Sequence, residues 1–446
     1  MRSRPSRLVL AVLAGVLLLG ACGNDSNDKN AGNTTTTAGG SQGTGKNAGK
    51  VTLFTAMEPE EATALQSVVD TLITPKVNYK TEIEASSDFE AQAKIRVQGG
   101  NPPDIIMYPQ PGAVVEQGKA GKAIALEDLG FNISDLEKTF GSYFMSLGEY
   151  NGKHYGLPTN INLKSMVWYP KKAFDAKGYK VPTTWDEMIA LSDKIKADGG
   201  TPWCVGFESG GATGWPATDW MEDIMLRTAG TATYDKWVKH EIPFNDPSVV
   251  TAGEDFGKIL FTQGYVLGGA KQTTSIAFGD APGPMFKNPP GCWLHRQATF
   301  INAFFPKDAK AGVDYDWFPF PPIKQQGILF GGELSAVFRD APEVRDFLRR
   351  FAGTEVQCAQ GKDIATSRVS PNVNVGPECY ANSILADASR VLTNSLKNGT
   401  GRFDASDLMP SAVGSGSFWT GMVNYVQGGP AALKPALDKI EASWPS

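Results

Sequence analysis

Histidine and cysteine are scarce in this chain of 446 residues. The three histidines, His154, His240 and His295, stand far apart, and none belongs to an H-E-x-x-H motif. The five cysteines show no C-x-x-C spacing, and no G-x-S-x-G nucleophile motif occurs beyond residue 50. These absences leave a zinc site, a haem site and a serine-hydrolase site without support. A glycosidase needs only two suitably spaced carboxylates, so composition leaves that class open.

Long apolar runs are equally rare, and the clearest one lies at the N-terminus. Leu8–Leu19 is too short to cross a bilayer as a helix, and three arginines precede it as in a signal peptide. The run closes on Leu-Gly-Ala before Cys22, an ending that resembles the bacterial lipobox. We therefore expect a lipoprotein signal peptide over residues 1–21 and a lipid, such as palmitate, on Cys22. The alternative is a plain secretory signal that is cut elsewhere.

The segment after Cys22 contains no large apolar side chain as far as residue 50. Gly, Asn, Thr, Ser and similar residues cannot bury enough surface to offset the entropy lost when a chain becomes ordered. Residues 22–50 are therefore expected to be the lipidated cysteine and a flexible linker. Such a coil reaches on the order of 30 Å. The mature protein is then extracytoplasmic and anchored to the cell membrane by its N-terminal lipid.

Neither the charge nor the remaining cysteines suggest a nucleic-acid-binding protein of the cytoplasm. Removing residues 1–21 takes away three arginines and no acidic residue, so the formal net charge moves from −5 to −8. A mildly acidic surface disfavours nucleic acid and anionic lipid, which leaves the lipid anchor as the expected membrane contact.

Four cysteines remain beyond Cys22, an even number in an oxidising compartment. Three pairings are possible; we favour Cys358–Cys379 as a local loop, and hence Cys204–Cys292.

The rest of the chain alternates short apolar runs with amphipathic segments, which is the pattern of an α/β protein. Its 396 residues from Val51 onward suffice for two domains. Thr184 and Glu187 form a capping box that opens a helix, and Gly331-Gly332 precedes a short apolar strand. The expected strands are 51–55, 77–83 and 104–108, and the expected helices are 60–72, 88–97, 184–198 and 342–351.

Aromatic side chains supply the positive functional signal. The chain has ten tryptophans, and Trp215, Trp293 and Trp419 stand in loop-like contexts among Gly, Ser, Thr and Pro. A sugar ring offers an apolar C–H face and a rim of hydroxyl groups, so its site needs flat rings together with polar side chains. Core packing is the alternative for any one of the three. Three such residues in separate segments favour a carbohydrate site.

Seven motifs follow one another along the chain: Asn101–Tyr108, Gly156–Thr159, Met166–Phe174, Pro182–Glu187, Pro202–Gly206, Trp215–Trp220 and Gly291–Trp293. Their order resembles the family 1 extracellular solute-binding proteins, the maltose-binding-protein-like receptors of carbohydrate ABC importers. The resemblance runs from Val51 to Ser446, and its last three motifs are closest to the α-glucoside-binding branch. Gln110-Pro111-Gly112 departs from the maltose receptor, where a charged stretch stands.

The resemblance implies a type II periplasmic-binding-protein fold with two α/β lobes joined by crossing hinge strands. Lobe one would hold residues 51–160 and 328–372, and lobe two residues 161–327 and 373–446. The ligand cleft lies between the lobes. Family ligand positions fall on Glu58, Asp88, Phe89, Tyr108, Gln110, Asn160, Asn162, Lys164, Trp215, Trp293 and Trp419. Glu333, which follows a Gly-Gly pair, and Asp404 and Asp407, on a polar loop, are added from their own contexts.

The sequence thus predicts a monomeric sugar receptor without cofactor, metal or catalytic residues, which delivers a carbohydrate to the transmembrane subunits of an ABC permease. Closure of the lobes around the solute would be the signal to the permease. The alternatives are a tethered glycosidase, a surface sensor or adhesion module, and a receptor for a polyol or a glycerol phosphodiester. The phosphodiester would need a cation near its phosphate, and Arg368 is the one candidate.

Overall fold

The computed structural model describes residues 49–445, which belong to one compact unit. The signal peptide, Cys22 and all but the end of the linker lie outside the described residues. Within the described part, no helix combines the length and the apolar character needed to cross a bilayer.

Six strands of the described chain form the main sheet, in the order β11-β10-β3-β1-β2 with β6 also paired to β10. β1 is parallel to β2 and β3, whereas β10 is antiparallel to β3 and β6. The buried face of β1 carries Val51 and Leu53, which accounts for its apolar alternation. The strands are β1 (Lys50–Thr55), β2 (Lys80–Ala85), β3 (Ile105–Tyr108), β6 (Leu157–Leu163), β10 (Ile328–Val337) and β11 (Gly401–Phe403).

The helices of the first lobe pack on this sheet and form its apolar core with β1 and β3. At the start of α1, the backbone N–H of Glu58 donates to the Glu61 carboxylate at 3.1 Å. A small hairpin, β4 (Glu149–Tyr150) and β5 (Lys153–His154), lies beside α3. The helices are α1 (Pro59–Leu72), η1 (Thr74–Lys76), α2 (Phe89–Gln98), α3 (Pro111–Lys119), α4 (Ile133–Phe140), α5 (Ser142–Ser146), α11 (Pro342–Phe351) and α12 (Thr354–Lys362).

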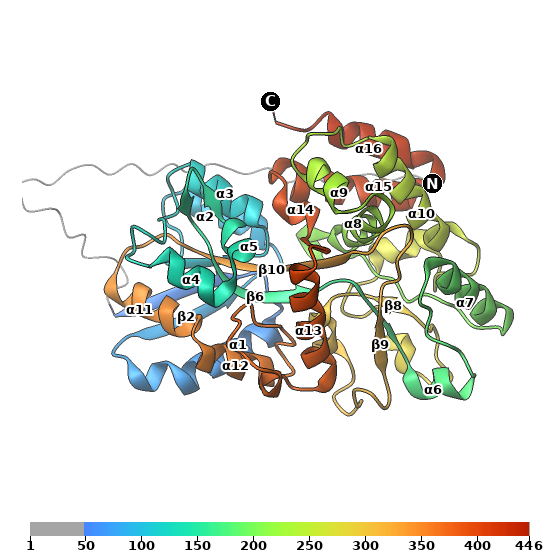
Figure 1. Ribbon diagram of the computed structural model, residues 1–446, viewed down its shortest axis with the longest axis horizontal. Coiled ribbons are helices and arrows are strands. Elements are labelled where there is room, and N and C mark those ends of the chain that lie inside the picture. The colour runs from blue at the N-terminus through green and yellow to red at the C-terminus, as the bar shows by residue number, and fades with distance from the viewer. Residues whose placement is uncertain (1–48, 446) are drawn as a thin grey trace, which may run out of the picture. The chain divides into compact units, whose positions relative to one another are not determined.

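The second lobe has its own core, built around α8 and a three-stranded sheet in the order β8-β7-β9. In Figure 1 the helices of the first lobe lie to the left, and most helices of the second lobe lie to the right. The elements are β7 (Met166–Tyr169), β8 (His295–Arg296), β9 (Asp316–Pro319), α6 (Lys171–Ala176), α7 (Trp185–Ala197), α8 (Trp215–Ala229), α9 (Thr231–Val238), α10 (Pro247–Phe261), α14 (Ala405–Leu408), α15 (Trp419–Gly428) and α16 (Leu433–Glu441).

Strands β6 and β10 run through the middle of the molecule between the two sets of helices (Figure 1). Gly331 and Gly332 lie inside β10, so the expectation that they precede a short strand is wrong. A Cβ atom on Gly332 would lie 2.4 Å from the carbonyl oxygen of Asn160, and one on Gly331 would lie 2.6 Å from Cε of Lys164. The glycines therefore let the two strands approach and leave room for the lysine side chain.

Short helices and one longer helix complete the described chain near the crossing strands and in the second lobe. Helix α13 (Ser383–Lys397) packs with β6, β10 and β11. The turn Ala412–Phe418 is a π-helix that leads directly into α15. The short helices are η2 (Gly210–Ala212), η3 (Ala270–Ser275), η4 (Gly283–Phe286), η5 (Thr299–Phe304), η6 (Pro377–Cys379), η7 (Ala412–Phe418) and η8 (Pro430–Ala432).

Both favoured disulfides are present, which confirms that prediction. Cys204–Cys292 joins two segments of the second lobe across 88 residues, and Cys358–Cys379 closes a local loop after α12. The expected strand at 77–83 begins later, at Lys80, because a short helix precedes it. Thr184 caps α7 by accepting the N–H of Glu187, and the Glu187 carboxylate accepts from the backbone N–H and the hydroxyl of Thr183.

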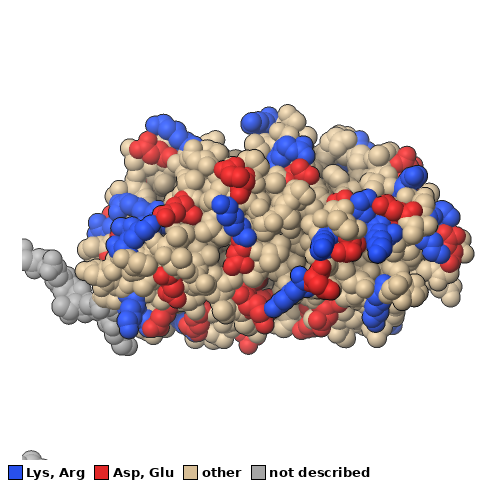
Figure 2. Space-filling model, turned by 90° about the horizontal axis from the view of Figure 1, so that it is seen from below, with Lys and Arg blue, Asp and Glu red and all other residues tan. Residues whose placement is uncertain are grey.

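The surface carries charges of both signs. On the face shown in Figure 2, Lys and Arg side chains alternate with Asp and Glu, and neither sign forms a broad patch. This face gives no electrostatic track for nucleic acid.

Candidate ligand-binding site

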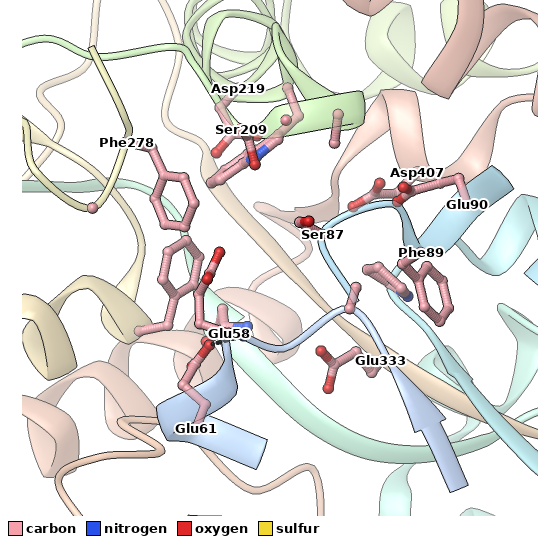
Figure 3. Close-up of a pocket in the computed structure, with 18 of the residues that line it drawn as sticks. Glu58, Glu61, Ser87, Phe89, Glu90, Ser209, Asp219, Phe278, Glu333 and Asp407 are labelled. Atoms are coloured by element: carbon pink, nitrogen blue, oxygen red, sulfur yellow. Dashed lines mark hydrogen bonds between the residues drawn. The ribbon is translucent and has the colours of Figure 1, made fainter. Parts of the chain in front are cut away.

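A cavity of about 530 Å³ lies between the two lobes (Figure 3). On the first lobe, its lining begins where three parallel strands end: Glu58 follows β1, Ser86 and Ser87 follow β2, and Gln110 follows β3. Loops at the carboxyl ends of parallel strands are the usual place for a ligand site in an open α/β sheet. The sheet thereby brings together residues that are far apart in the sequence.

The second lobe contributes five of the six aromatic side chains of the lining, together with acidic and small residues. Trp215 begins α8, half-buried, and its ring centroid lies 5.3 Å from that of Phe278 and 5.8 Å from that of Phe300. Phe304 adds a fourth ring, and Trp419 lies 5% exposed in the cavity lining. The indole Nε1 of Trp419 has no hydrogen-bond partner among the described residues. A buried donor that lines a cavity without a partner is suited to an acceptor atom on a ligand.

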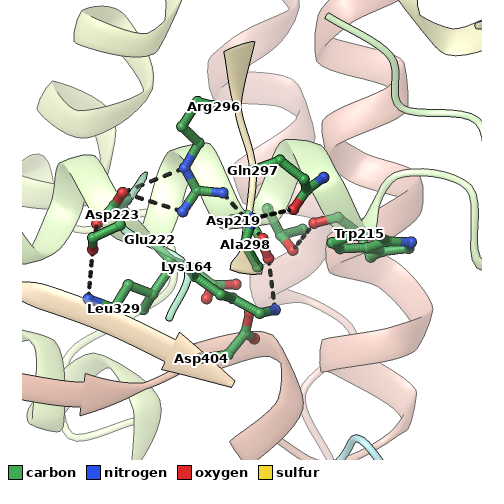
Figure 4. A network of polar contacts seen from close by, with 12 residues as sticks. Lys164, Trp215, Asp219, Glu222, Asp223, Arg296, Gln297, Ala298, Leu329 and Asp404 are labelled. Atoms are coloured by element: carbon green, nitrogen blue, oxygen red, sulfur yellow. Dashed lines mark hydrogen bonds and ion pairs between the residues drawn. The ribbon is translucent and has the colours of Figure 1, made fainter. Parts of the chain in front are cut away.

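Below the aromatic rings, Lys164 stands at the centre of a buried charge network (Figure 4). Its Nζ lies 2.6 Å from Asp404 Oδ2, 2.9 Å from Asp219 Oδ1 and 5.4 Å from the Trp215 ring centroid. Although burial opposes a charge, Asp219 and Asp404 raise the pKa of Lys164 well above its usual value. The lysine is therefore a permanent cation in the cavity lining.

A second layer of charges holds the acidic partners of Lys164 in place. Arg296 lies 3.0 Å from Asp219 and 3.1 Å from Asp223, which also pairs with Arg227. Burial raises the pKa of Asp219 to about 6 against the pull of Lys164 and Arg296. For Asp404, the nearby Lys164 outweighs the effect of burial and lowers the pKa to about 2. Asp404 is consequently ionised over the whole physiological range.

Three carboxylates of this network stand close enough to hold a metal ion. Oxygen atoms of Asp219, Glu222 and Asp404 lie within 4.8 Å of one another. However, Lys164 Nζ already contacts two of the three side chains, and Glu222 accepts the backbone N–H groups of Ala405 and Ser406. The ammonium group thus supplies the positive charge that a metal would bring.

A second buried cation lies at the first-lobe side of the cavity. Arg368 is 3.0 Å from Glu61 Oε1 and 3.4 Å from Glu333 Oε1, and Asn160 donates to the other oxygen of Glu333. Burial raises the pKa of Glu61, while Arg368 opposes that rise. Because two carboxylates already occupy the guanidinium group, Arg368 is poorly placed to receive a phosphate, which weakens the glycerol phosphodiester alternative.

Comparison with known proteins places the chain in a family. Residues 59–357 match the family described as bacterial extracellular solute-binding protein. The chain belongs to this family.

Two full-length relatives are consistent with that assignment. The osmoprotective compounds-binding protein GgtB of Synechocystis is 38% identical over 402 residues, which cover 89% of this chain and 92% of that protein. The alpha-glucosides-binding periplasmic protein AglE of Rhizobium meliloti is 39% identical over 409 residues, which cover 89% and 87%. Both are binding proteins, and this solute-binding protein is accordingly not an enzyme. The glycosidase alternative is thereby set aside.

Solved structures show the same fold. The bacterial solute receptor AcbH superposes with a TM-score of 0.74 at 18% identity and covers 88% of this chain and 97% of its own. The solute-binding protein RafE in complex with raffinose gives a TM-score of 0.70 at 20% identity, covering 88% and 99%. The expected two-lobed, maltose-binding-protein-like fold is confirmed. The exact lobe boundaries stay a prediction, as does the monomeric state.

Ten of the residues expected at the site of this solute-binding protein line the cavity. The ten come from both lobes and from the crossing strand, and Asn162 is further held by the hydroxyl of Thr299 at 3.2 Å. Their role in binding stays a prediction. They are Glu58, Phe89, Gln110, Asn162, Lys164, Trp215, Glu333, Asp404, Asp407 and Trp419.

Three other expected residues lie near the cavity without lining it. Asp88 is exposed at the start of α2, where a Cβ on Gly211 of the other lobe would come within 3.1 Å of its Oδ1. Tyr108 is 4% exposed and packs edge-on against Phe89. Asn160 is bound to Glu333 within the crossing strands. These residues support the lining from behind or from the rim.

Trp293 is placed elsewhere, so its expected position in the cleft is corrected. It is 4% exposed in the second-lobe core, and its ring packs edge-on against Tyr179 with centroids 5.1 Å apart. The neighbouring Cys292 is bonded to Cys204, which ties this segment to the lobe interior. The glycine and proline residues near Trp293 correctly predicted a loop, but the disulfide holds that loop against the interior of the second lobe.

Several lining residues were missed by sequence reasoning. Glu61, Glu90 and Glu208 are acids that no motif distinguishes from surface carboxylates. Phe278 lies in Ala277-Phe-Gly-Asp280, an aromatic residue beside glycine in a loop. That is the same signal used for the tryptophans, and applied to phenylalanine it would have found this ring.

Proposed function

We propose that this protein is a lipid-anchored extracytoplasmic receptor that binds an α-glucoside or a short oligosaccharide in the cavity and delivers it to an ABC permease. The observation that carries the proposal is the pairing of two unlike surfaces around one space. Aromatic rings of the second lobe face carboxylates and amides at the strand ends of the first lobe. A volume of about 530 Å³ is in the range of small-molecule sites.

The chemistry of the two surfaces matches the two aspects of a sugar. The half-buried ring of Trp215 and the ring of Phe278 offer flat apolar faces for C–H groups. Glu58, Gln110 and Glu333 offer acceptors for hydroxyl hydrogens, and the unpartnered indole N–H of Trp419 offers a donor. Two or three such rings together with a set of hydrogen bonds are compatible with micromolar binding, about −8 kcal/mol.

The charge of the cavity supports a neutral solute. Lys164 and Arg368 are its two cations among the described lining residues, and both are occupied by carboxylates. Glu58, Glu208 and Asp280 line the cavity without an ion pair in the described structure. An anionic ligand would meet uncompensated negative charge, whereas hydroxyl groups of a neutral solute donate readily to carboxylates.

The names of the relatives refine the choice of solute. AglE is named for alpha-glucosides, which supports the α-glucoside reading at 39% identity. GgtB is named for osmoprotective compounds, and this favours a polyol or other small osmoprotectant as the second candidate. Both candidates are neutral or nearly so and rich in hydroxyl groups, as the cavity requires.

A thermal-shift screen followed by calorimetry tests the solute. The Cys22→Ala protein, produced without its lipid, is mixed with glucose, maltose, trehalose, sucrose, longer α-glucans and polyols, and each mixture is followed by mass for turnover. A rise in melting temperature with one intact α-glucoside supports the proposal. A polyol as the sole binder moves the assignment to the second candidate, and no response to any member removes the sugar.

The anchor and the permease need separate tests. Wild-type protein is expected to incorporate labelled palmitate and to sediment with membranes, whereas Cys22→Ala is expected to do neither. Sugar uptake by cells that carry the receptor with its permease should stop when the receptor is deleted and return with the wild-type chain. Palmitate labelling that persists in Cys22→Ala would contradict the lipid assignment.

A further inference from the structure

Two carboxyl groups from opposite lobes meet in the cavity. Glu90 lies in the first turn of α2, and Asp407 lies in α14 of the second lobe; both line the cavity. Figure 3 shows their carboxyl groups directed toward each other at one corner. The negative charge of Glu90 is one of the causes that raise the pKa of Asp407. Like charges so placed oppose each other unless a proton or a donor lies between them.

The nearby cations compensate the charge of this pair only in part. Lys164 Nζ is 3.8 Å from Asp407 but only 2.6 Å from Asp404. Arg296 is taken up by Asp219 and Asp223. For Glu90, the described structure contains a hydrogen bond from the Gln110 amide, 3.1 Å, and no ion pair.

Burial and neighbouring negative charges favour the protonated forms of both carboxyl groups. Burial, and then the neighbouring Asp404, raise the pKa of Asp407 well above its usual value, against the effect of Lys164. Burial likewise raises the pKa of Glu90, against its hydrogen bonds. The titratable and charged groups on α3, α8 and α9, which pack against α14, are Glu116, Lys119, Asp219, Glu222, Asp223, Arg227, Tyr234, Asp235 and Lys236. Asp88, Tyr108, Lys164, Glu208, Arg296 and Asp404 lie on adjoining segments.

We propose that the Glu90–Asp407 pair holds one proton when a solute is bound, so that solute binding is coupled to proton uptake from solvent. The inference rests on the proposed function, since it concerns the same cavity. A carboxylic acid at Asp407 donates a hydrogen bond to a solute oxygen, and Glu90 accepts from a solute hydroxyl or from that proton. The pair thereby specifies a ligand with both an acceptor and a donor at this corner.

The sign of the pH dependence follows from this arrangement. The bound form with both lobes around the pair holds the proton more tightly than a form with the lobes apart, where each group is better solvated. Affinity for a neutral sugar is therefore highest at low pH and falls as pH rises from the usual carboxyl range through the raised pKa of the pair. A single linked proton limits the slope to about tenfold per pH unit.

Calorimetry between pH 4.5 and 8 tests the coupling with a sugar identified in the screen. Each pH is measured in two buffers with different ionisation enthalpies, which gives the number of protons taken up. We expect up to one proton for the wild-type protein. Asp407→Asn should flatten the pH slope, because an amide donates at every pH, and Asp407→Ala should lower affinity at least tenfold. Glu90→Gln tests the pair from the other lobe and should also flatten the slope.

The exposed Glu137 on α4 provides the control, and Glu137→Gln should keep the wild-type slope. Sugar binding without proton uptake at any pH would overturn the coupling and leave the receptor function standing. Unchanged slopes in both Asp407→Asn and Glu90→Gln would do the same. A protein that binds no member of the panel would remove the receptor function itself, and the coupling with it.

Discussion

The two walls of the cavity are built in different ways. The first wall consists of polar residues placed one after another at the ends of β1, β2 and β3, so the parallel sheet sets their spacing. The second wall combines acidic side chains with aromatic rings from loops and helix starts, and these rings pack on one another. Lys164, which follows β6, lies between them and is bound to carboxylates of the second lobe.

This difference suggests a division of roles. Aromatic rings bury apolar area over a wide range of solute positions, so the second wall should supply most of the affinity. Carboxylates and amides at fixed strand ends accept hydrogen bonds only from correctly placed hydroxyl groups, so the first wall should supply most of the selectivity. Substitutions in each wall separate these roles. We expect the largest effect at Lys164, which lies between the two walls.

Removing the charge of Lys164 should have the largest effect. Lys164→Met leaves Asp219 and Asp404 without their common cation in a buried site, and breaking a buried ion pair in this way costs about 3–5 kcal/mol of stability. Urea unfolding followed by fluorescence measures the loss. As a control, Lys138→Met removes an exposed lysine of α4 and should change stability by less than about 0.5 kcal/mol. Equal stability of the two variants would contradict the role given to the network.

Trp293 should matter for folding rather than for binding. It is buried against Tyr179, so Trp293→Ala leaves a cavity in the second-lobe core and should destabilise the protein by about 3–5 kcal/mol. At a temperature where the variant is folded, its sugar affinity should equal that of the wild type. A large loss of affinity with normal stability would return Trp293 to the site.

Trp215 should show the opposite behaviour. Its ring lines the cavity and is half-buried, so Trp215→Ala should weaken sugar binding at least tenfold, about 1.4 kcal/mol, with little change in unfolding. Titration calorimetry gives the affinity, and Trp215→Phe is the matched control that keeps a flat ring. If alanine and phenylalanine behaved alike, stacking on this residue would not explain the affinity.

The two tryptophans also show how far sequence reasoning reaches. Each stands beside glycine and proline, and both contexts indicate a loop; only the Cys204–Cys292 bond and the packing on Tyr179 distinguish the buried residue. Glu58 and Gln110, which follow β1 and β3, were implied by the family resemblance rather than by a local pattern, and both line the cavity. Local patterns did predict α1 and α11, whose bounds were expected within a residue.

What the sequence could not supply is long-range pairing of charges. Asp404 is found 240 residues from Lys164, and Glu90 faces Asp407 across the cleft. No local pattern distinguishes such acids from those on the surface. The glycines of β10 are a similar case: a Gly-Gly pair usually indicates a break, yet here the strand continues because its neighbour and Lys164 need the space.

The smallest expected effect concerns Glu58, on the first wall. Burial raises its pKa, and Glu60 and Glu208 raise it further. Because the pKa is higher in the folded state, the protonated Glu58 side chain favours folding. This contribution to stability is complete below the usual carboxyl pKa and is lost as pH rises through the folded-state pKa. Glu58→Gln removes this loss, so its melting temperature should fall less than that of the wild type between pH 4 and pH 7. Affinity should drop only about threefold, since one acceptor is kept by the amide oxygen. A loss as large as that of Trp215→Ala would show that the first wall carries affinity as well as selectivity.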